Sequence, residues 1–309
     1  MPETLPEHAP VQILMSTYNG ARWIEAQLES FLAQSHLYWQ LWVSDDGSSD
    51  ATRDILRAFD ARNPGKLVAV LEGPGKGSAA NFIHLLCHDA LPSGIVALSD
   101  QDDVWHPHKL ERAVSALQSA GPVPCVWSAR YRITDARQRP LWDSPVWTRG
   151  PSLGNALVQN IISGHTLTLN AAALAQVRAA GPQNVPFHDW WIYLLMMATG
   201  GRALVDSEIV LDYRQHGGNV MGQRGSARAR AGRMNAVLRG ALQGWIAQNL
   251  QALALAKALP LTREAETLTQ NWPRAGALQR IGLMRAFDIH RQSRHETVLL
   301  YLSAAMGRI

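Results

Sequence analysis

The chain has 309 residues, 47% of them hydrophobic and 17% charged, and a formal net charge of +4. This balance is typical of a globular protein and excludes a disordered or collagen-like chain. The two cysteines, Cys87 and Cys125, are too few for a disulfide framework and favour a cytoplasmic protein. No uninterrupted run of about 18 apolar residues occurs, so we expect no membrane-spanning helix.

Strand and helix patterns alternate through the first 120 residues. Residues 1–10 lack a signal-peptide pattern and are expected to form a disordered leader. Short apolar runs bounded by turn residues predict buried strands at 11–16, 40–45, 66–72 and 94–100. Helical patterns follow them at 21–33, 49–61, 78–91 and 106–120. This alternation predicts an α/β fold, with a doubly wound, mostly parallel sheet flanked by helices.

The pattern becomes less regular after residue 121. Strands are predicted at 124–133, 165–170 and 202–216, with helices at 171–180 and 189–199 between them. Beyond residue 224 the strand signals end, and a helical pattern rich in Arg, Ala and Leu continues with breaks at Pro260 and Pro273. We therefore expect one domain over 11–224 and a basic, helical C-terminal region over 225–309.

Positive charge is concentrated in that last region. Residues 1–221 carry 16 Lys and Arg against 21 Asp and Glu, whereas residues 222–309 carry 13 against 4. Such asymmetry favours contact with an anionic surface, and we expect a peripheral membrane contact and no nucleic acid. Two other interpretations remain open: a solvated basic helix face, and a helical subdomain that packs on the domain or on a second subunit.

The first four predicted strands all end in polar residues, and open α/β sheets bind ligands outside the carboxyl ends of their strands. The first strand ends in "STYNG" and the second in "SDDGSSD", where Asp45 and Asp46 precede a turn. A carboxylate that projects there can accept an N–H from a uracil or thymine ring, on which Tyr18 can stack. Alternatively, the Asp and Ser residues only cap the next helix.

The third strand leads into "EGPGKGSAANF", which lacks the spacing of a P-loop. No dinucleotide-binding glycine pattern follows the first strand either, so a P-loop ATPase and a dinucleotide oxidoreductase are excluded. Lys76 can approach a phosphate, although an ordinary solvent-exposed lysine explains it equally well.

The fourth strand ends in "SDQDD", which crowds Asp100, Asp102 and Asp103 together. Neighbouring carboxylates raise one another's pKa unless they share a cation or hydrogen-bond donors. Because Mg²⁺ and Mn²⁺ prefer oxygen ligands and bridge carboxylates to substrate phosphates, the cluster predicts a divalent metal site.

Together these segments resemble the family 2 glycosyltransferases, which are inverting enzymes of the GT-A fold. The matching segments, within residues 11–221, are "LMSTYNGARWIEAQLESFLAQS", "WVSDDGSSDAT", "ALSDQDDVWHPHKL", "FHDWW" and "YRQHGGN". Within the family, "SDQDDVW" and "YRQHGGN" are most similar to rhamnosyltransferases of bacterial cell-surface polysaccharide assembly.

The resemblance implies a role for each matching position. The nucleotide-sugar contacts that it implies are Ser16, Tyr18, Asp46 and Asp100. We also expect Lys76 and Asn81, in the segment after the third strand, to contact the nucleotide sugar. The metal ligands would be Asp102, with Asp103 as the alternative because the doubled Asp leaves the register open, and His216, which approaches the metal or the diphosphate. Asp189 matches the catalytic base, and Gly164 and His165 match the acceptor side. Independently of the resemblance, Trp190 and Trp191 could add an acceptor surface, because aromatic faces suit sugar rings. Structural alternatives remain open for Asp189 as a helix N-cap, for His165 as a core histidine and for the two tryptophans as buried packing.

We therefore expect a metal-dependent inverting glycosyltransferase at the cytoplasmic membrane face. Its donor would be a dTDP- or UDP-sugar, with dTDP-L-rhamnose indicated by the resemblance, and its acceptor a glycan or a lipid-linked intermediate. The chemistry is consistent, because a metal neutralises the leaving diphosphate and a carboxylate deprotonates the acceptor hydroxyl. The alternatives are a nucleotidyltransferase and a non-catalytic glycan- or membrane-binding protein on a transferase scaffold.

Overall fold

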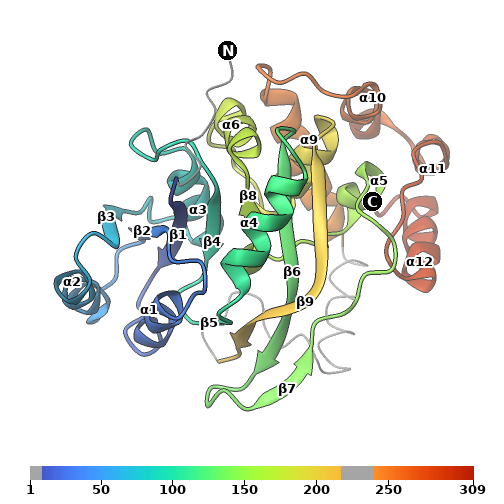
Figure 1. Ribbon diagram of the computed structural model, residues 1–309. Helices are drawn as coiled ribbons and strands as arrows, with labels where there is room; N and C mark the ends of the chain where they lie inside the picture. The colour runs from blue at the N-terminus through green and yellow to red at the C-terminus, as the bar shows by residue number, and fades with distance from the viewer. Residues whose placement is uncertain (1–8, 217–239) are drawn as a thin grey trace.

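The computed structural model describes residues 9–216 and 240–309 (Figure 1). The expected leader at 1–10 lies almost entirely outside the described residues. The expected boundary near residue 224 also lies outside them.

The first half of the chain forms the predicted parallel α/β arrangement. Strand β1 (Val11–Thr17) lies between β2 (Trp39–Asp45) and β4 (Val96–Ser99), and β3 (Leu67–Glu72) pairs with β2, all in parallel. The intervening helices are α1 (Ile24–Leu32), α2 (Thr52–Arg62), α3 (Ser78–Leu86) and α4 (Lys109–Ser119). The predicted strands and helices of this half are therefore confirmed, and the expected α/β fold class with them. The expectation that the strand at 66–72 is buried is wrong, because Val68 and Val70 are 43% and 40% exposed on one side of β3.

The second half adds mixed strands to the same sheet. The strands are β5 (Val104–Trp105), β6 (Cys125–Thr134), β7 (Pro140–Asp143), β8 (Thr168–Leu169) and β9 (Arg202–Arg214). In the described residues the sheet order is β3-β2-β1-β4-β8-β6-β9-β5, with β7 on β6. Strand β8 is antiparallel to both β4 and β6, whereas β9 is parallel to β6. Helix α4 covers β6 and β9, in front of them in Figure 1.

The predicted strand at 165–170 is only partly a strand. Residues Gly164–Thr166 form a 3-10 turn (η1), and only Thr168–Leu169 pair with neighbours. Three short elements among the described residues were not predicted: β5, β7 and α5 (Leu153–Val158). All three are too short to show a hydrophobic period.

The core packs against both faces of the sheet. In β1, Leu14 belongs to one apolar cluster, whereas Ile13 and Met15 belong to the other, as expected because alternate residues of a strand face opposite sides. Helix α6 (Ala171–Ala180) and helix α7 (His188–Ala198) complete the face that contains Leu14. Helix α7 is apolar on all sides and is buried along nearly its whole length.

Residues 240–309, the described part of the C-terminal region, are helical, with the breaks at Pro260 and Pro273 where they were predicted. Helix α9 (Ala241–Leu255) contacts α5 and α7 and contributes to the same core. The chain then forms α10 (Arg263–Asn271), η2 (Trp272–Arg274), α11 (Ala277–Ala286) and α12 (Arg294–Ala305), on the right in Figure 1. None of the helices within the described ranges has the length and apolar character needed to cross a membrane.

Candidate functional site

The polar segments that follow β1 and β4 are joined by Gln101. Its Oε1 accepts the backbone N–H of Tyr18 and its Nε2 donates to the Tyr18 carbonyl, both at 2.9 Å. A Cβ on Gly20 would lie 2.1 Å from the Gln101 Oε1, so only glycine fits beside this amide. Gln101 was not singled out from the sequence, because an exposed glutamine between aspartates carries no distinct pattern.

The two aspartates after β2 have different surroundings. Asp45 is fully buried and accepts hydrogen bonds from Ser48, Thr17 and Arg53. Burial alone would raise the pKa of Asp45, but these donors hold it below its usual value. Asp46 is half-buried, and its two oxygens accept the N–H groups of Gly75 at 2.7 Å and Gly77 at 2.8 Å. Asp46 is therefore the more accessible carboxylate of the pair, and it binds the backbone of the glycine-rich segment after β3.

The other expected nucleotide contacts lie at different depths. Tyr18 and Lys76 are exposed beside this edge. Asn81 is fully buried, and its Nδ2 donates to the Ser16 Oγ at 2.7 Å and to the Ser44 carbonyl at 2.9 Å. The Asn81 side chain therefore reaches Ser16 and β2 rather than the surface, so it can influence a ligand only through Ser16.

An acidic cluster follows β4, as predicted. Asp103 is fully buried, and neither of its oxygens has a hydrogen-bond partner among the described residues. Burial, followed by the charges of Asp102 and Asp100, raises the pKa of Asp103 well above its usual value. Burial and then the charges of Asp102 and Asp189 raise the pKa of Asp100 to about 7, although its side chain is 35% exposed. A cation would relieve this repulsion.

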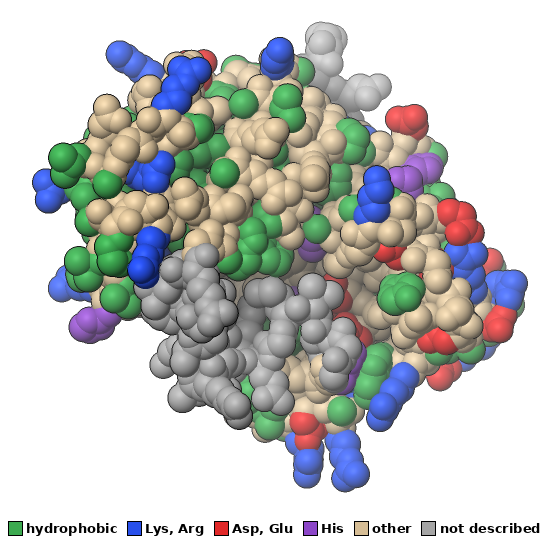
Figure 2. Space-filling view, turned by 180° about the vertical axis from the view of Figure 1, so that it is seen from behind, with side chains coloured by type: hydrophobic (Ala, Val, Ile, Leu, Met, Phe, Trp, Pro, Cys, Tyr) green, Lys and Arg blue, Asp and Glu red, His purple; other side chains and the backbone are tan. Residues whose placement is uncertain are grey.

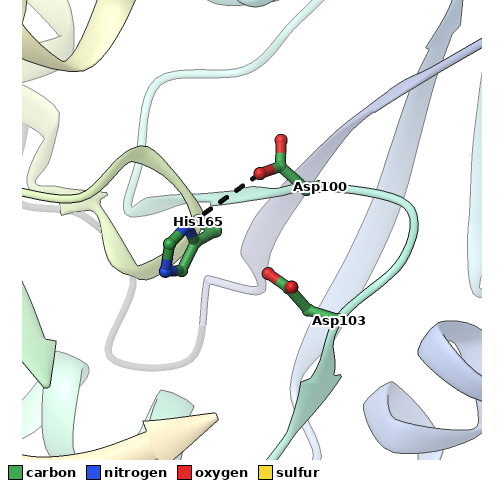
Figure 3. A group of neighbouring side chains, drawn as sticks. All are labelled: Asp100, Asp103 and His165. Carbon is green, nitrogen blue, oxygen red and sulfur yellow. Dashed lines mark ion pairs between the residues drawn. The ribbon is translucent and has the colours of Figure 1, made fainter. Parts of the chain in front are cut away.

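His165 joins this cluster, which the sequence did not predict. Figure 3 shows Asp100, Asp103 and His165 directed toward a common space, and one potential ligand atom from each lies within 4.8 Å of the others. The His165 Nδ1 is 3.9 Å from the Asp100 Oδ2. Two carboxylates and an imidazole, with an orphaned buried carboxylate among them, suit a divalent metal.

Asp102 is paired separately with His216. The His216 Nε2 lies 2.7 Å from the Asp102 Oδ2, and its ring stacks on Trp23 with centroids 5.0 Å apart. The Arg214 guanidinium carbon also lies over the Trp23 ring, 4.7 Å from the ring centroid. The Arg214 Nε donates to the Asp102 carbonyl. The expected ligands Asp102, Asp103 and His216 thus fall into two neighbouring groups, with Asp103 beside Asp100 and His165.

A buried lysine lies beneath the cluster. Lys109 is fully buried, its Nζ donates to the His165 carbonyl at 2.9 Å, and the same Nζ lies 3.0 Å from the Trp105 ring centroid. Burial lowers the pKa of Lys109 well below its usual value, against the opposing charges of Asp103 and Asp100. Sequence reasoning missed this residue because lysines at helix starts are usually solvated.

Asp189 stands at the N-terminus of α7 and is held by two backbone amides. Its Oδ2 accepts the Gly164 N–H at 3.0 Å, and its Oδ1 accepts the Trp190 N–H at 2.7 Å. Trp190 and Trp191 are buried, and the Trp190 Nε1 donates to the Ala156 carbonyl. The expectation that both tryptophans form an acceptor surface is therefore wrong, because α7 buries them in the core.

The chain matches known proteins over much of its length. The family model described as Glycosyl transferase family 2 matches residues 12–176. The chain is 27% identical over 235 residues to dTDP-rhamnosyl transferase RfbG of Shigella flexneri, across 72% of this chain and 78% of that protein. It is 34% identical over 108 residues to UDP-Glc:alpha-D-GlcNAc-diphosphoundecaprenol beta-1,3-glucosyltransferase WfgD of Escherichia coli, across 35% of this chain and 40% of that protein.

The fold is also similar to that of solved enzymes. Mannosyltransferase PcManGT from Pyrobaculum calidifontis, in complex with GDP-Man and Mn2+, has a TM-score of 0.55 and 20% identity, across 99% of this chain and 90% of that one. The curled α/β sheet with its flanking helices is thus that of a GT-A glycosyltransferase. The chain belongs to glycosyl transferase family 2, and the resemblance found in the sequence is confirmed.

Proposed function

We propose that the protein is a metal-dependent inverting enzyme that transfers L-rhamnose from dTDP-rhamnose to a lipid-linked polysaccharide intermediate on the cytoplasmic membrane face. The similarity to RfbG supports the donor. The name of WfgD describes a glucosyltransferase that acts on a diphosphoundecaprenol-linked sugar, which supports the acceptor class. The complex of PcManGT with GDP-Man and Mn2+ supports a nucleotide-sugar donor and a divalent metal.

The donor would lie along the carboxyl ends of β1, β2 and β4. Asp46 would accept the imide N–H of the base, Tyr18 would stack on it, and Ser16 and Asp100 would lie near the ribose. Lys76, exposed on the glycine-rich segment after β3, would approach a phosphate. The sugar would then point toward Asp189.

The residues of the acidic cluster fit a divalent metal. Asp102 and Asp103 would hold it with Asp100, and imidazole nitrogens could come from His165, which lies with Asp100 and Asp103, and from His216, which contacts Asp102. When bound, the ion neutralises the charge that develops on the leaving diphosphate.

Asp189 is proposed as the general base, and the observation that supports this role is the position of its carboxylate. It is a carboxylate outside the "SDQDD" segment, yet it is close enough to raise the pKa of Asp100. Backbone amides occupy one position on each of its oxygens, which leaves further lone pairs free to accept an acceptor hydroxyl proton. An inverting displacement needs a base on the side of the sugar opposite the leaving group, and one carboxylate suffices.

The test compares a panel of nucleotide sugars with wild-type protein and Asp189→Asn. We expect release of the nucleoside diphosphate to be fastest with dTDP-L-rhamnose. Asp189→Asn should bind donor and metal normally but lose at least about 100-fold in transfer, since an amide cannot accept the proton. Normal transfer by this variant would move the base elsewhere, and release of pyrophosphate in place of the diphosphate would favour a nucleotidyltransferase.

We also propose that the C-terminal helices contact the membrane. Val298 and Leu302 of α12, and Met306 at the C-cap of this helix, recur at intervals of four and are 59%, 53% and 55% exposed. Figure 2 shows hydrophobic and basic side chains together over the face that the C-terminal helices form. Apolar helix faces beside arginines are typical of segments that lie in anionic bilayer interfaces. A second subunit is the competing occupant of this face.

A further inference from the structure

The turn η1, which contacts Asp189, is attached to both β6 and α4. The Thr166 and Ser128 hydroxyl oxygens are 2.7 Å apart, which ties η1 to β6. The Lys109 Nζ donates to the His165 carbonyl, which ties the turn to α4. With both attachments in place, the backbone of η1 has little freedom to move away from α7.

The turn also touches the ring of His188. A Cβ added to Gly164 would lie 2.6 Å from the His188 Nε2 and 3.0 Å from its Cε1. His188 is 8% exposed, and its ring packs on Phe82 with centroids 4.2 Å apart. The ring is thus held in place by the core, and only glycine can approach it this closely.

This contact has a consequence for the proposed base. With no Cβ at residue 164, the turn can reach the N-terminus of α7 and place the Gly164 N–H 3.0 Å from the Asp189 Oδ2. The second amide, from Trp190, belongs to the same helix as Asp189 and cannot by itself fix the carboxylate relative to the sheet. The Gly164 N–H comes from a different element and ties the carboxylate directly to η1.

We propose that Gly164 is a positioning residue for Asp189, and that the buried His188 ring sets how closely the turn approaches. The inference rests on the proposed role of Asp189 as the base. It assigns to Gly164 a part in the orientation of the base instead of a direct contact with the acceptor. A misplacement of about 1 Å near reacting groups can lower a rate about 100-fold.

The test is a double-mutant cycle on full-length protein with Gly164→Ala, His188→Ala and the double variant. We expect Gly164→Ala to lower kcat about 10- to 100-fold, with the KM for the donor changed less than about twofold. Removal of the His188 ring leaves space for the methyl group that Gly164→Ala adds. In the His188→Ala background, the loss of kcat caused by Gly164→Ala should therefore be at least about tenfold smaller than in the wild-type background. Gly244→Ala is the matched control, because nothing lies within 4 Å of a Cβ there, and it should retain normal turnover.

Two results overturn the proposal. One is normal kcat in Gly164→Ala, and the other is equal effects of the methyl in both backgrounds, which would show that the His188 ring does not set the distance. Thermal melts of each variant distinguish loss of fold from loss of rate. Asp189→Asn distinguishes this proposal from the proposed function. If that variant is fully active while the effects of Gly164→Ala and His188→Ala on kcat are coupled, Asp189 is not the base, but the steric contact between Gly164 and His188 still stands.

Discussion

The His216 Nε2 lies 2.7 Å from the Asp102 Oδ2, although 114 residues separate the two side chains. The contact joins the end of β9 to the segment after β4, and the Trp23 ring holds the imidazole plane in place. Elements from three parts of the chain therefore orient one carboxylate. Groups that orient metal ligands typically contribute 10- to 100-fold to metal affinity.

Replacement of Trp23 should therefore weaken metal binding. We expect Trp23→Ala to lower the affinity for Mn2+ about 10-fold or more, because the His216 ring loses its stacking partner. Trp23→Phe keeps an aromatic face and should lose much less. Calorimetric titration with Mn2+ measures both, and equal affinities for wild type and Trp23→Ala would show that stacking does not orient the site.

Loss of the metal should abolish transfer. Asp102→Ala and treatment with EDTA should each reduce nucleoside diphosphate release to background, since an unneutralised diphosphate is a poor leaving group. Addition of Mn2+ should restore the EDTA-treated enzyme but not the variant. Asp60→Ala, on the exposed side of α2, is the control. Full activity without metal would remove the ion from the mechanism.

Asp45 should stabilise the fold in a pH-dependent way. Its carboxylate is buried and bonded to Arg53 at 2.8 Å, so Asp45→Asn should lower the free energy of unfolding at pH 7 by about 1.5 kcal/mol. Because the pKa of Asp45 is lowered in the folded state, this stabilisation is present above the unfolded pKa of about 3.9 and is lost as the pH falls through the lower folded value.

Denaturation at pH 7 and at pH 3 measures this effect. The difference in stability between wild type and Asp45→Asn should shrink at the lower pH. Asp60→Asn should change stability by less than about 0.5 kcal/mol at either pH, as is usual for exposed positions. A difference that stays constant down to pH 3 would mean that the Asp45 charge is not the source of the stabilisation.

The first part of the sheet could be predicted from the sequence. Strands β1, β2 and β4 are buried on both faces, whereas the residues of β3 alternate between half-buried and exposed. Strands β1 to β4 are short apolar runs between turns, and their carboxyl ends must meet at one edge when they are parallel. Strand β7 could not be predicted, because it begins at Pro140 and its residues are mostly exposed, so it has no apolar alternation. The antiparallel pairing of β8 depends on contacts with both β4 and β6, which no local pattern indicates.

The site could be predicted only to the level of its segments. The sequence indicates that "SDQDD" is acidic, but only the fold brings His165 to Asp100 and Asp103 and places Lys109 below them. Buried charges such as Lys109 cannot be distinguished from surface lysines by composition. Trp190 and Trp191 show the opposite case. Their residue type suits contact with a sugar ring at the surface, but both side chains are buried in the core.

Association with anionic membranes should depend on α12. Each basic residue near an anionic surface contributes about 1 kcal/mol, and apolar side chains add to this by burial. Full-length protein should float with vesicles that contain anionic lipid at low salt and less at high salt. The double variant Val298→Glu/Leu302→Glu should stay unbound at both. Point variants are preferable to truncation, because α9 contributes to the core that contains α7.

Leu37→Glu is the matched control, since Leu37 is 66% exposed but lies outside the C-terminal helices. This variant should float like wild type. If wild type stays unbound at both salt concentrations, or if the α12 variant binds as well as the control, the membrane contact is wrong. A mass by light scattering that corresponds to a dimer for wild type, and to a monomer for the α12 variant, would then assign the exposed face to a second subunit.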